Sequence, residues 1–250
     1  MGKEEVKRKC WILFLILVIS LLAIVAVGFK ADKAIAWPII FGTMIIMFMT
    51  IGWSVSINNR FMGVLINERN SMSLSRFQMV LWSLIILSAY AAIALIRARS
   101  GQGVDAMEVT VPTELWMLMG INSASLVGSP MLSSNKTKKR PINTNLSEIN
   151  DMGILSVKKD ENDASITDLF RGDEVNNWNY VDMPRLQMFF FTIVVAIVYC
   201  VEVYQIVNGE NVSSTVALPT IDEGMITLMG ISNAAYLGGK AVDQTPATQK

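Results

Sequence analysis

Six long apolar blocks constrain the fold of this 250-residue chain more than any other feature of its sequence. A helix needs about 20 mainly apolar residues to cross a bilayer. The blocks lie at residues 11–28, 37–55, 78–96, 112–128, 187–207 and 219–238. Apolar residues make up 52% of the chain and its mean hydropathy is +0.43, which is too apolar for an ordinary soluble domain. The sequence therefore predicts an all-α membrane protein with six transmembrane helices in three hairpins.

The third and fourth blocks share motifs with the fifth and sixth. An Arg-x-Gln-Met motif opens the third and fifth blocks, and a Leu-Met-Gly-Ile motif lies in the fourth and sixth. A duplicated unit of two helices is the economical explanation. We therefore predict two hairpin repeats, residues 73–129 and 183–240, after an N-terminal transmembrane hairpin at residues 1–56. Whether that first hairpin is a third, diverged repeat stays open.

The basic residues predict how the six helices are oriented. If both termini lie in the cytoplasm, only Lys30, Lys33, Arg97 and Arg99 of the 21 lysines and arginines fall on the outer side. Cytoplasmic loops of membrane proteins are enriched in lysine and arginine, so both termini are expected to be cytoplasmic. The two repeats then run in the same direction. The inverted repeats that many alternating-access carriers contain are not visible.

A polar segment at residues 130–182 separates the two repeats and is expected to be a cytoplasmic loop. Its first part has a basic cluster followed by many Asn, Ser and Asp residues with little periodicity, so we expect it to be flexible. The polar tail at residues 241–250 is also expected to be flexible.

One short amphipathic helix is predicted inside this loop, near residues 165–171. Ser165 and Asp168 have the spacing of a capping box, in which each side chain accepts a hydrogen bond from the backbone of the other residue. The apolar residues expected to share one face of this helix are Ile166, Leu169 and Phe170. Such a helix would lie at the membrane surface or against the helix bundle.

Small residues recur at every fourth position in the fourth and sixth blocks. Such lines let helix backbones approach closely within a membrane. The residues are Gly120, Ala124 and Gly128 in the fourth block and Gly230, Ala234 and Gly238 in the sixth. Either the two helices cross each other within one subunit, or these lines form a contact between subunits or a surface that faces a pore.

Polar residues gather in the same two blocks. They are Asn122, Ser123 and Ser125 in the fourth block and Thr227, Ser232 and Asn233 in the sixth. At membrane depth a polar side chain must face protein or water, because lipid offers it no hydrogen-bond partner. Hydrogen bonds between helices and an aqueous path both explain the pattern, and the sequence leaves both open.

Carboxylates gather on the predicted outer side. They are Glu114, Glu202, Asp222 and Glu223. Acids in the first turn of a helix are favoured by the helix dipole and need no function, but Glu202 lies within a block between Val201 and Val203. A charged ring at a channel mouth would be built from such residues in an oligomer.

The Arg-x-Gln pairs of the repeated motif mark the predicted inner ends of the third and fifth helices. They are Arg76 and Gln78 in the first repeat and Arg185 and Gln187 in the second. One interpretation is that they are anchors in the headgroup region, with the arginines obeying the cytoplasmic bias of basic residues. The other is a docking collar for the long loop or for a partner.

The absence of histidine excludes several kinds of chemistry. A Ser-His dyad, an imidazole metal site and a histidine proton relay all require this side chain. No Walker motif or Gly-x-Gly-x-x-Gly motif is present either. We therefore expect no enzymatic activity and no catalytic residue, and we expect neither a cofactor, a metal ion nor a nucleic acid as a ligand.

Three stretches of the chain resemble a group of prokaryotic multi-pass membrane proteins. These stretches are residues 168–174 (Asp-Leu-Phe-Arg-Gly-Asp-Glu), residues 181–192 around the second Arg-x-Gln-Met motif, and residues 223–232, which contain Leu-x-Gly-Ile-Ser. The resemblance covers roughly residues 73–240. It implies hairpins led by Arg-x-Gln-Met and a prokaryotic cytoplasmic membrane, and it implies no activity.

Three hypotheses for the function follow. The first is a homo-oligomeric ion channel or membrane-permeabilising pore, which fits the small residues, the polar residues and the outer acids. The second is a non-conducting membrane anchor or regulatory subunit that docks a cytoplasmic protein through residues 130–182. A small-solute carrier is the third, and the missing inverted symmetry disfavours it.

Overall fold

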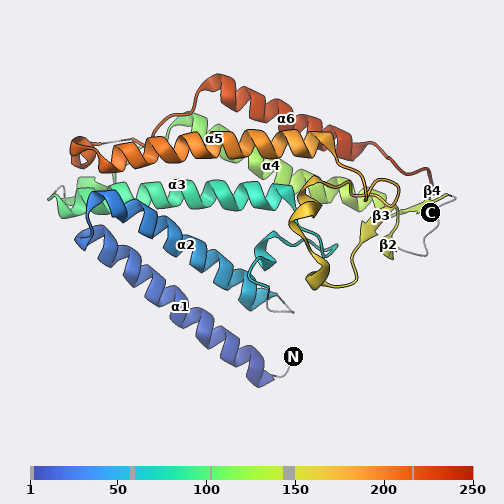
Figure 1. Ribbon diagram of the computed structural model, residues 1–250, viewed down its shortest axis with the longest axis horizontal. Coiled ribbons are helices and arrows are strands. Elements are labelled where there is room, and N and C mark those ends of the chain that lie inside the picture. The colour runs from blue at the N-terminus through green and yellow to red at the C-terminus, as the bar shows by residue number, and fades with distance from the viewer. Residues whose placement is uncertain (1–2, 57–59, 102, 143–149, 216, 250) are drawn as a thin grey trace. The chain divides into compact units, whose positions relative to one another are not determined.

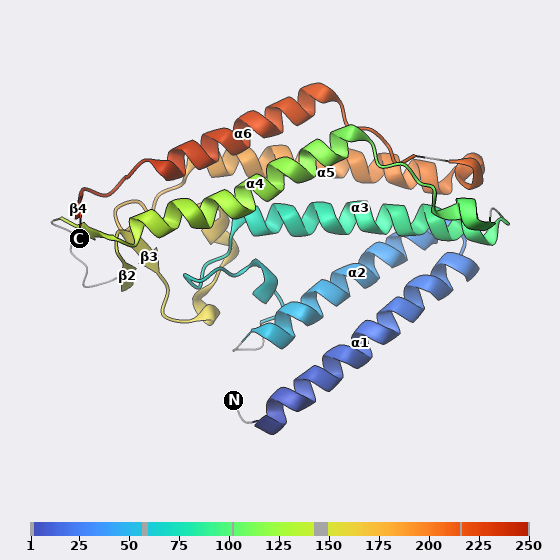
Figure 2. The same ribbon diagram turned by 180° about the vertical axis from the view of Figure 1, so that it is seen from behind.

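The computed structural model describes residues 3–56, 60–101, 103–142, 150–215 and 217–249, and most of these residues are helical. Figures 1 and 2 show the long helices from opposite sides. Their bounds are α1 (Lys3–Lys30), α2 (Lys33–Val55), α3 (Leu74–Arg99), α4 (Thr113–Lys136), α5 (Met183–Asn208) and α6 (Glu223–Ala241). The strands are β1 (Lys139–Pro141), β2 (Asn150–Met152), β3 (Leu155–Val157) and β4 (Ala247–Gln249). Short 3₁₀ turns are η1 (Gly63–Leu65), η2 (Gly103–Met107), η4 (Glu161–Asp163), η5 (Ile166–Phe170) and η6 (Glu210–Ser214).

Five of the long helices, α1 to α5, are long and apolar enough to cross a membrane. The chain is therefore a helical membrane protein, as the apolar blocks predict. Helix α6 is not among the five. It begins at Glu223 and has only 19 residues, and its glycines, serine and asparagine dilute its apolar side chains. The sixth predicted span thus stays a prediction.

The chain divides into two compact units, and each contains parts of several helices. The first unit comprises Met1–Val64, Val80–Trp116 and Val195–Ile221, and the second comprises Leu65–Met79, Met117–Val194 and Asp222–Lys250. The first unit is almost entirely helical. The second holds all four strands together with α6 and most of α4.

Aromatic side chains lie among the aliphatic ones in the interior of the first unit. Trp82 is fully buried and meets the edge of Tyr199, with ring centroids 6.0 Å apart. The indole of Trp37 donates a hydrogen bond to Ser88 Oγ over 3.0 Å, which satisfies its buried N–H. By contrast, α1 leaves Trp11 exposed, as a helix facing hydrocarbon would.

Arg97 closes the loops that follow α3 and α5 in the first unit. Its guanidinium donates to the backbone carbonyls of Asp105 (2.8 Å), Glu108 (3.3 Å) and Thr215 (2.5 Å). The residue is only 3% exposed. The Asp105 carbonyl also accepts from the Glu108 amide over 3.0 Å, so Arg97 adds to the hydrogen bonds that hold these loops together.

In the second unit the starts of α3 and α5 pack together. The rings of Phe77 and Phe189 stack with centroids 5.6 Å apart. One turn further on, the Gln78 amide donates to Thr192 Oγ1 over 2.5 Å. Phe77 and Gln78 belong to the first Arg-x-Gln-Met motif, and Phe189 directly follows the second. The repeated motif therefore brings together the two helices that it opens.

Helices α4 and α6 also pack together in the second unit. Ser125 donates a hydrogen bond to the Asn233 side chain, and the Ser129 and Tyr236 hydroxyls lie 3.1 Å apart. An added methyl group at Gly230 would lie 3.6 Å from Ile121. Because these contacts advance in the same direction along both helices, this part of α4 runs parallel to α6.

The segment between α4 and α5 is more ordered than the sequence analysis expected. Helix α4 continues past Pro130 to Lys136, so the loop begins later than residue 130. Strands β2 and β3 form an antiparallel hairpin. Part of the stretch expected to be flexible, residues 143–149, lies outside the described residues. The tail expected to be flexible contains β4, which pairs antiparallel with β1.

The capping box at Ser165 and Asp168 is confirmed, but the element that it caps is the five-residue 3₁₀ turn η5. Leu169 is 3% exposed and packs in the core of the second unit, whereas Ile166 is 57% exposed. The predicted shared face is therefore wrong for Ile166. Side chains three positions apart lie on the same side of a 3₁₀ turn, so the turn type does not explain why Ile166 is exposed while Leu169 is buried.

Replacing Gly153 by alanine should destabilise the second unit. This residue joins β2 to β3 with φ +69°, and an added Cβ would lie 2.4 Å from the Lys136 carbonyl oxygen. We expect a loss of more than about 1 kcal/mol, measured by thermal unfolding in detergent. Gly101 is the matched control, because it has φ +84° but open space around the position of a Cβ. Equal losses for both alanine variants would contradict the role of the close contact.

Candidate functional site

Asp173 is the centre of a buried cluster of charges in the second unit. Its carboxylate forms ion pairs with Arg69, with Arg185 at 2.5 Å and with Lys240 at 2.7 Å. All four side chains are at most 10% exposed. Asp182 also contacts Arg185, at 3.2 Å, from a partly exposed position. The cluster links the segment before α3, the start of α5 and the end of α6.

A tight turn positions Arg69 for this role. The Asn67 side chain accepts a hydrogen bond from the Arg69 amide over 3.0 Å, and Asn70 has φ +56°, a conformation that asparagine tolerates well. The Arg69 guanidinium then donates to the backbone carbonyl of Asp173 at 2.9 Å and to that of Ser156 at 3.3 Å. One side chain thus fastens the turn to β3 and to the Asp173 segment.

Tyr236 of α6 supports two of the cations. The Arg185 guanidinium lies 5.5 Å from the centre of its ring and the Lys240 ammonium 5.7 Å from it. Lys240 also donates to Ser129 Oγ over 2.6 Å. Cations over an aromatic face are attracted by its quadrupole, most strongly away from water. The Tyr236 ring therefore stabilises charges that the single carboxylate of Asp173 would not balance alone.

The cluster keeps Asp173 ionised. Burial by itself favours the neutral carboxyl group and would raise its pKa, but the attraction of Arg185, Arg69 and Lys240 outweighs this effect. The pKa of Asp173 therefore lies well below its ordinary value. A carboxylate held in this way is a poor general acid or base near neutral pH. The arrangement is suited to fixing chain segments in place and not to proton transfer.

Glu174, the next residue, fastens a second set of segments. It forms an ion pair with Lys136, at the end of α4, and both side chains are at most 4% exposed. Its other carboxylate oxygen accepts hydrogen bonds from the backbone amides of Gln244 (2.9 Å) and Thr245 (2.6 Å). Two adjacent acids therefore form ion pairs with the lysines in the last turns of α4 and α6. Glu174 also binds the backbone of the chain after α6.

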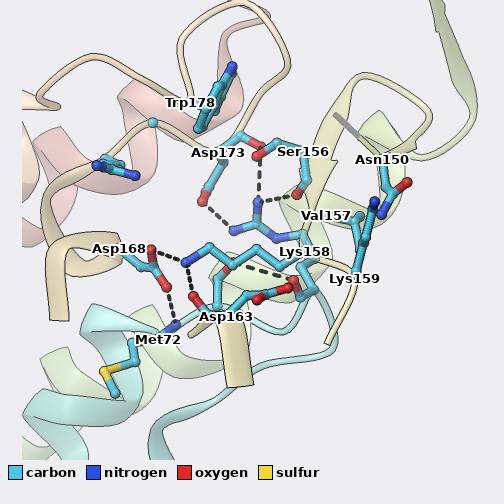
Figure 3. A pocket seen from close by; sticks show the side chains of 14 residues that line it. Met72, Asn150, Ser156, Val157, Lys158, Lys159, Asp163, Asp168, Asp173 and Trp178 are labelled. Atoms are coloured by element: carbon cyan, nitrogen blue, oxygen red, sulfur yellow. Dashed lines mark hydrogen bonds and ion pairs between the residues drawn. The ribbon is translucent and has the colours of Figure 1, made fainter. Parts of the chain in front are cut away.

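A cavity of about 290 Å³ lies beside this cluster, within the second unit. Figure 3 shows Asp168, Lys158 and Met72 on one side of it and Trp178 with Asp173 on another. Lys158 and Asp168 form an ion pair at 2.6 Å, and the Met72 amide donates to Asp168 over 3.3 Å. The walls come from the turn before α3, from Asn150 of β2, from β3 with the two lysines that follow it, and from residues 163–178.

The polar residues predicted in the fourth and sixth blocks occupy two kinds of position. Those that are at most 3% exposed are Asn122, Ser125, Ser232 and Asn233. Ser123 is exposed, and so is Thr227, whose hydroxyl donates to the Glu223 carbonyl of its own helix over 2.9 Å. The structure therefore brings Ser125 and Asn233 together and keeps Ser123 away from α6.

The predicted lines of small residues do not form the main contact between α4 and α6. Gly120, Ala124, Ala234 and Gly238 are exposed, and an added Cβ at Gly120 or Gly238 would meet nothing within 4 Å. Only Gly128 and Gly230 approach the other helix, through Leu237 and Ile121. The contact instead follows a neighbouring stripe that includes Ser125, Ser129, Asn233 and Tyr236.

The predicted outer acids differ in their surroundings. Asp222 is the N-cap of α6, and its carboxylate accepts hydrogen bonds from the amides of Gly224 (2.9 Å) and Met225 (3.3 Å). Glu223 is exposed in the first turn, where the dipole favours it. Glu114 and Glu202 are half-buried in the first unit. A local capping role explains Asp222 without any further function.

The two Arg-x-Gln pairs are not equivalent in space. Gln78 is fully buried, whereas Gln187 is exposed. Arg76 donates to the Ile66 carbonyl over 2.8 Å, whereas Arg185 belongs to the Asp173 cluster. Arg185 was open to two interpretations, an anchor in the headgroup region or part of a docking collar for the long loop or a partner, and it pairs with Asp173 of that loop. Asp173 and Glu174, the acids that organise the site, were not predicted.

One signal could have pointed to these two acids. They close the Asp-Leu-Phe-Arg-Gly-Asp-Glu stretch, which the resemblance had already singled out without a role. Comparisons with protein-family models, with curated proteins and with solved structures found no match for this chain.

Proposed function

We propose that this protein is a non-conducting membrane anchor or regulatory subunit that holds a soluble partner at the cytoplasmic face. In this proposal α6 also crosses the prokaryotic cytoplasmic membrane, both termini are cytoplasmic, and α3–α4 and α5–α6 are hairpins of the same direction. The burial of the polar side chains between α4 and α6 carries the proposal.

A water-filled path would leave such side chains accessible. Asn122 and Ser125 are instead completely buried, and Ser232 and Asn233 are at most 3% exposed within a single chain. The Asn233 amide also donates to the Met229 carbonyl of its own helix over 2.9 Å. Interhelical hydrogen bonds in membranes contribute roughly 0.6 kcal/mol each, so the bond between Ser125 and Asn233 is suited to holding α4 against α6. The side chains of Asn122 and Ser232 have no hydrogen-bond partner among the described residues.

The polar segment of the second unit offers a preformed surface for a partner. Buried ion pairs join Asp173 to Arg185 of α5 and Glu174 to Lys136 of α4, so this segment is fixed to both helices. The capping box fixes the start of η5. Ile166 projects from η5 with 57% of its surface exposed. A rigid surface loses little conformational entropy on binding, which favours docking. Residues 165–178 would be the part that contacts the partner.

A homo-oligomeric channel is the second candidate, and one observation favours it. Gly120, Ser123 and Ala124 are exposed on α4, where close approach of a second copy would be possible. In such an oligomer Ser123 would lie at the contact or beside a path. The two candidates differ in whether ions cross the membrane.

Purified protein in liposomes should give no ion flux above that of empty liposomes. Glu202→Gln is the companion variant, because a charged residue within α5 would influence a pore. If the wild type gives an ion flux and Glu202→Gln changes that flux, the anchor proposal is overturned in favour of a channel.

Cysteine labelling gives an independent readout in a Cys10→Ser, Cys200→Ser background. A cysteine at position 232 should not react with a water-soluble thiol reagent in folded protein, because Ser232 is 1% exposed. A cysteine in place of the exposed Lys138 should react. Rapid labelling at positions 123 and 232 together would indicate a water path.

A further inference from the structure

The cavity beside the Asp173 cluster is lined by both acids and bases, and its acids already have partners. Asp173 pairs with three cations. Asp168 accepts hydrogen bonds from the amides of Met72 and Ser165 and pairs with Lys158. The Asp163 carboxylate accepts from the Asp160 amide over 3.3 Å. The two buried acids, Asp168 and Asp173, therefore have little acceptor capacity left for a cationic ligand, whereas Asp163 is exposed to water.

Two cations in the lining have no such partner. Arg171 is half-buried and Lys159 exposed, and within the described part of the chain neither side chain has a hydrogen bond or an ion pair. Lys158 adds a third positive group, which is already paired with Asp168. The cavity thus has an excess of unpaired positive charge, which an anion would neutralise.

The shape and the remaining lining suit a small organic ligand. The volume of about 290 Å³ lies at the lower end of the range for small-molecule sites. Trp178 lines the cavity and is half-buried, so its ring offers a flat apolar surface. Arginine and lysine together match a phosphate group, which the guanidinium fork can bind through two oxygens.

We propose that this cavity binds a phosphate-bearing ligand. The unpaired cations of the lining, Arg171 and Lys159, attract the phosphate, and Trp178 offers a surface for the organic part of the molecule. The ligand is a small phosphorylated metabolite or the headgroup of an anionic phospholipid, since both present the same group. The inference does not depend on a protein partner or on ion conduction, so its failure would leave the anchor proposal untouched.

Binding can be measured on the full chain in an uncharged detergent, by calorimetry with adenosine monophosphate and with inorganic phosphate. Arg171→Ala and Lys159→Ala should each weaken binding by about tenfold or more, because each removes a charged hydrogen-bond donor. Arg140→Ala and Lys138→Ala are the matched controls, since both residues are exposed and lie outside the cavity. They should change the affinity by less than about twofold.

A second arm distinguishes the two sources of the phosphate. The protein is placed in nanodiscs of phosphatidylcholine alone or with phosphatidylglycerol, and its thermal stability is compared. If phosphatidylglycerol stabilises the protein, Lys159→Ala abolishes this effect and the soluble probes do not bind, the headgroup is the ligand. Lys159 is exposed and unpaired within the described residues, so this variant should fold even if Arg171→Ala does not.

The proposal is overturned in either of two cases. In the first, neither soluble probe binds and phosphatidylglycerol gives no stabilisation. In the second, the Lys138→Ala and Arg140→Ala controls weaken binding as much as the cavity variants, which indicates attraction to a basic surface and no defined site.

Discussion

Asp173→Asn is expected to destabilise the protein by about 3–5 kcal/mol, because breaking a buried ion pair leaves its partner charges uncompensated. The asparagine has nearly the same shape, so the loss would come from the charge. Arg69, Arg185 and Lys240 would remain buried beside a neutral side chain. Thermal unfolding in detergent, followed by loss of the monodisperse peak in size-exclusion chromatography, measures the effect.

Two further variants test the cause of this loss. Asp182→Asn removes a carboxylate that also contacts Arg185 but is 27% exposed, so it should cost less than about 1 kcal/mol. Lys240→Met in the Asp173→Asn background removes one stranded cation and should restore part of the stability. An Asp173→Asn variant as stable as the wild type would show that the cluster contributes little to the fold.

The same cluster predicts how stability depends on pH. The pKa of Asp173 is lower in the folded protein than its ordinary value of 3.8. Its contribution is therefore fully present above that ordinary value, where the carboxylate is ionised in both states. As the pH falls below it, the unfolded chain takes up the proton first, and the contribution is lost progressively down to the folded pKa. Asp173→Asn should flatten this part of the stability curve.

Lys136→Met is expected to have an effect of similar size, about 3–5 kcal/mol, because it strands Glu174 in the interior. Glu174 and Lys136 are 2% and 4% exposed, respectively, so water cannot replace the lost partner. The methionine keeps most of the volume of the lysine stem. Melting curves in the same detergent give the comparison.

Lys139→Met provides a control three residues away. Lys139 pairs with Asp243, but these side chains are 24% and 32% exposed, and exposed ion pairs contribute about 0–1 kcal/mol. Equal losses for Lys136→Met and Lys139→Met would contradict the distinction between the buried and the exposed pair. Most of the loss expected for Lys136→Met comes from the uncompensated carboxylate of Glu174 and not from the absence of the lysine. Glu174→Gln combined with Lys136→Met should therefore recover part of the loss.

The parts of the fold that could be predicted are those that local sequence determines. A block of about 20 mainly apolar residues is typical of a helix that crosses a bilayer. The helices α1 to α5 were therefore predictable. The capping box at Ser165 and Asp168 depends on residues three positions apart and was predictable for the same reason. The type of turn was not, because a short 3₁₀ turn has the same start signal as a longer helix.

The charge cluster could not be derived from periodicity. Arg69 and Asp173 are separated by 104 positions in the chain, and no spacing rule connects them. Arg185 fitted the general bias of basic residues toward the cytoplasmic side, which concealed its specific partner. The polar composition after residue 128 suggested the end of the fourth helix, but α4 continues past Pro130 to the buried Lys136. In each case a long-range contact decided what a local rule left undetermined.

The order of the cluster along the chain has a consequence for how the protein is made. Arg69 leaves the ribosome first, then Asp173 and Arg185, and Lys240 only after α6 has been synthesised. Glu174 likewise waits for the amides of Gln244 and Thr245. The polar segment therefore cannot complete its ion pairs until α6 has been synthesised. A nascent chain stalled before that point would expose an unfinished charge centre that quality-control proteases can distinguish from finished protein.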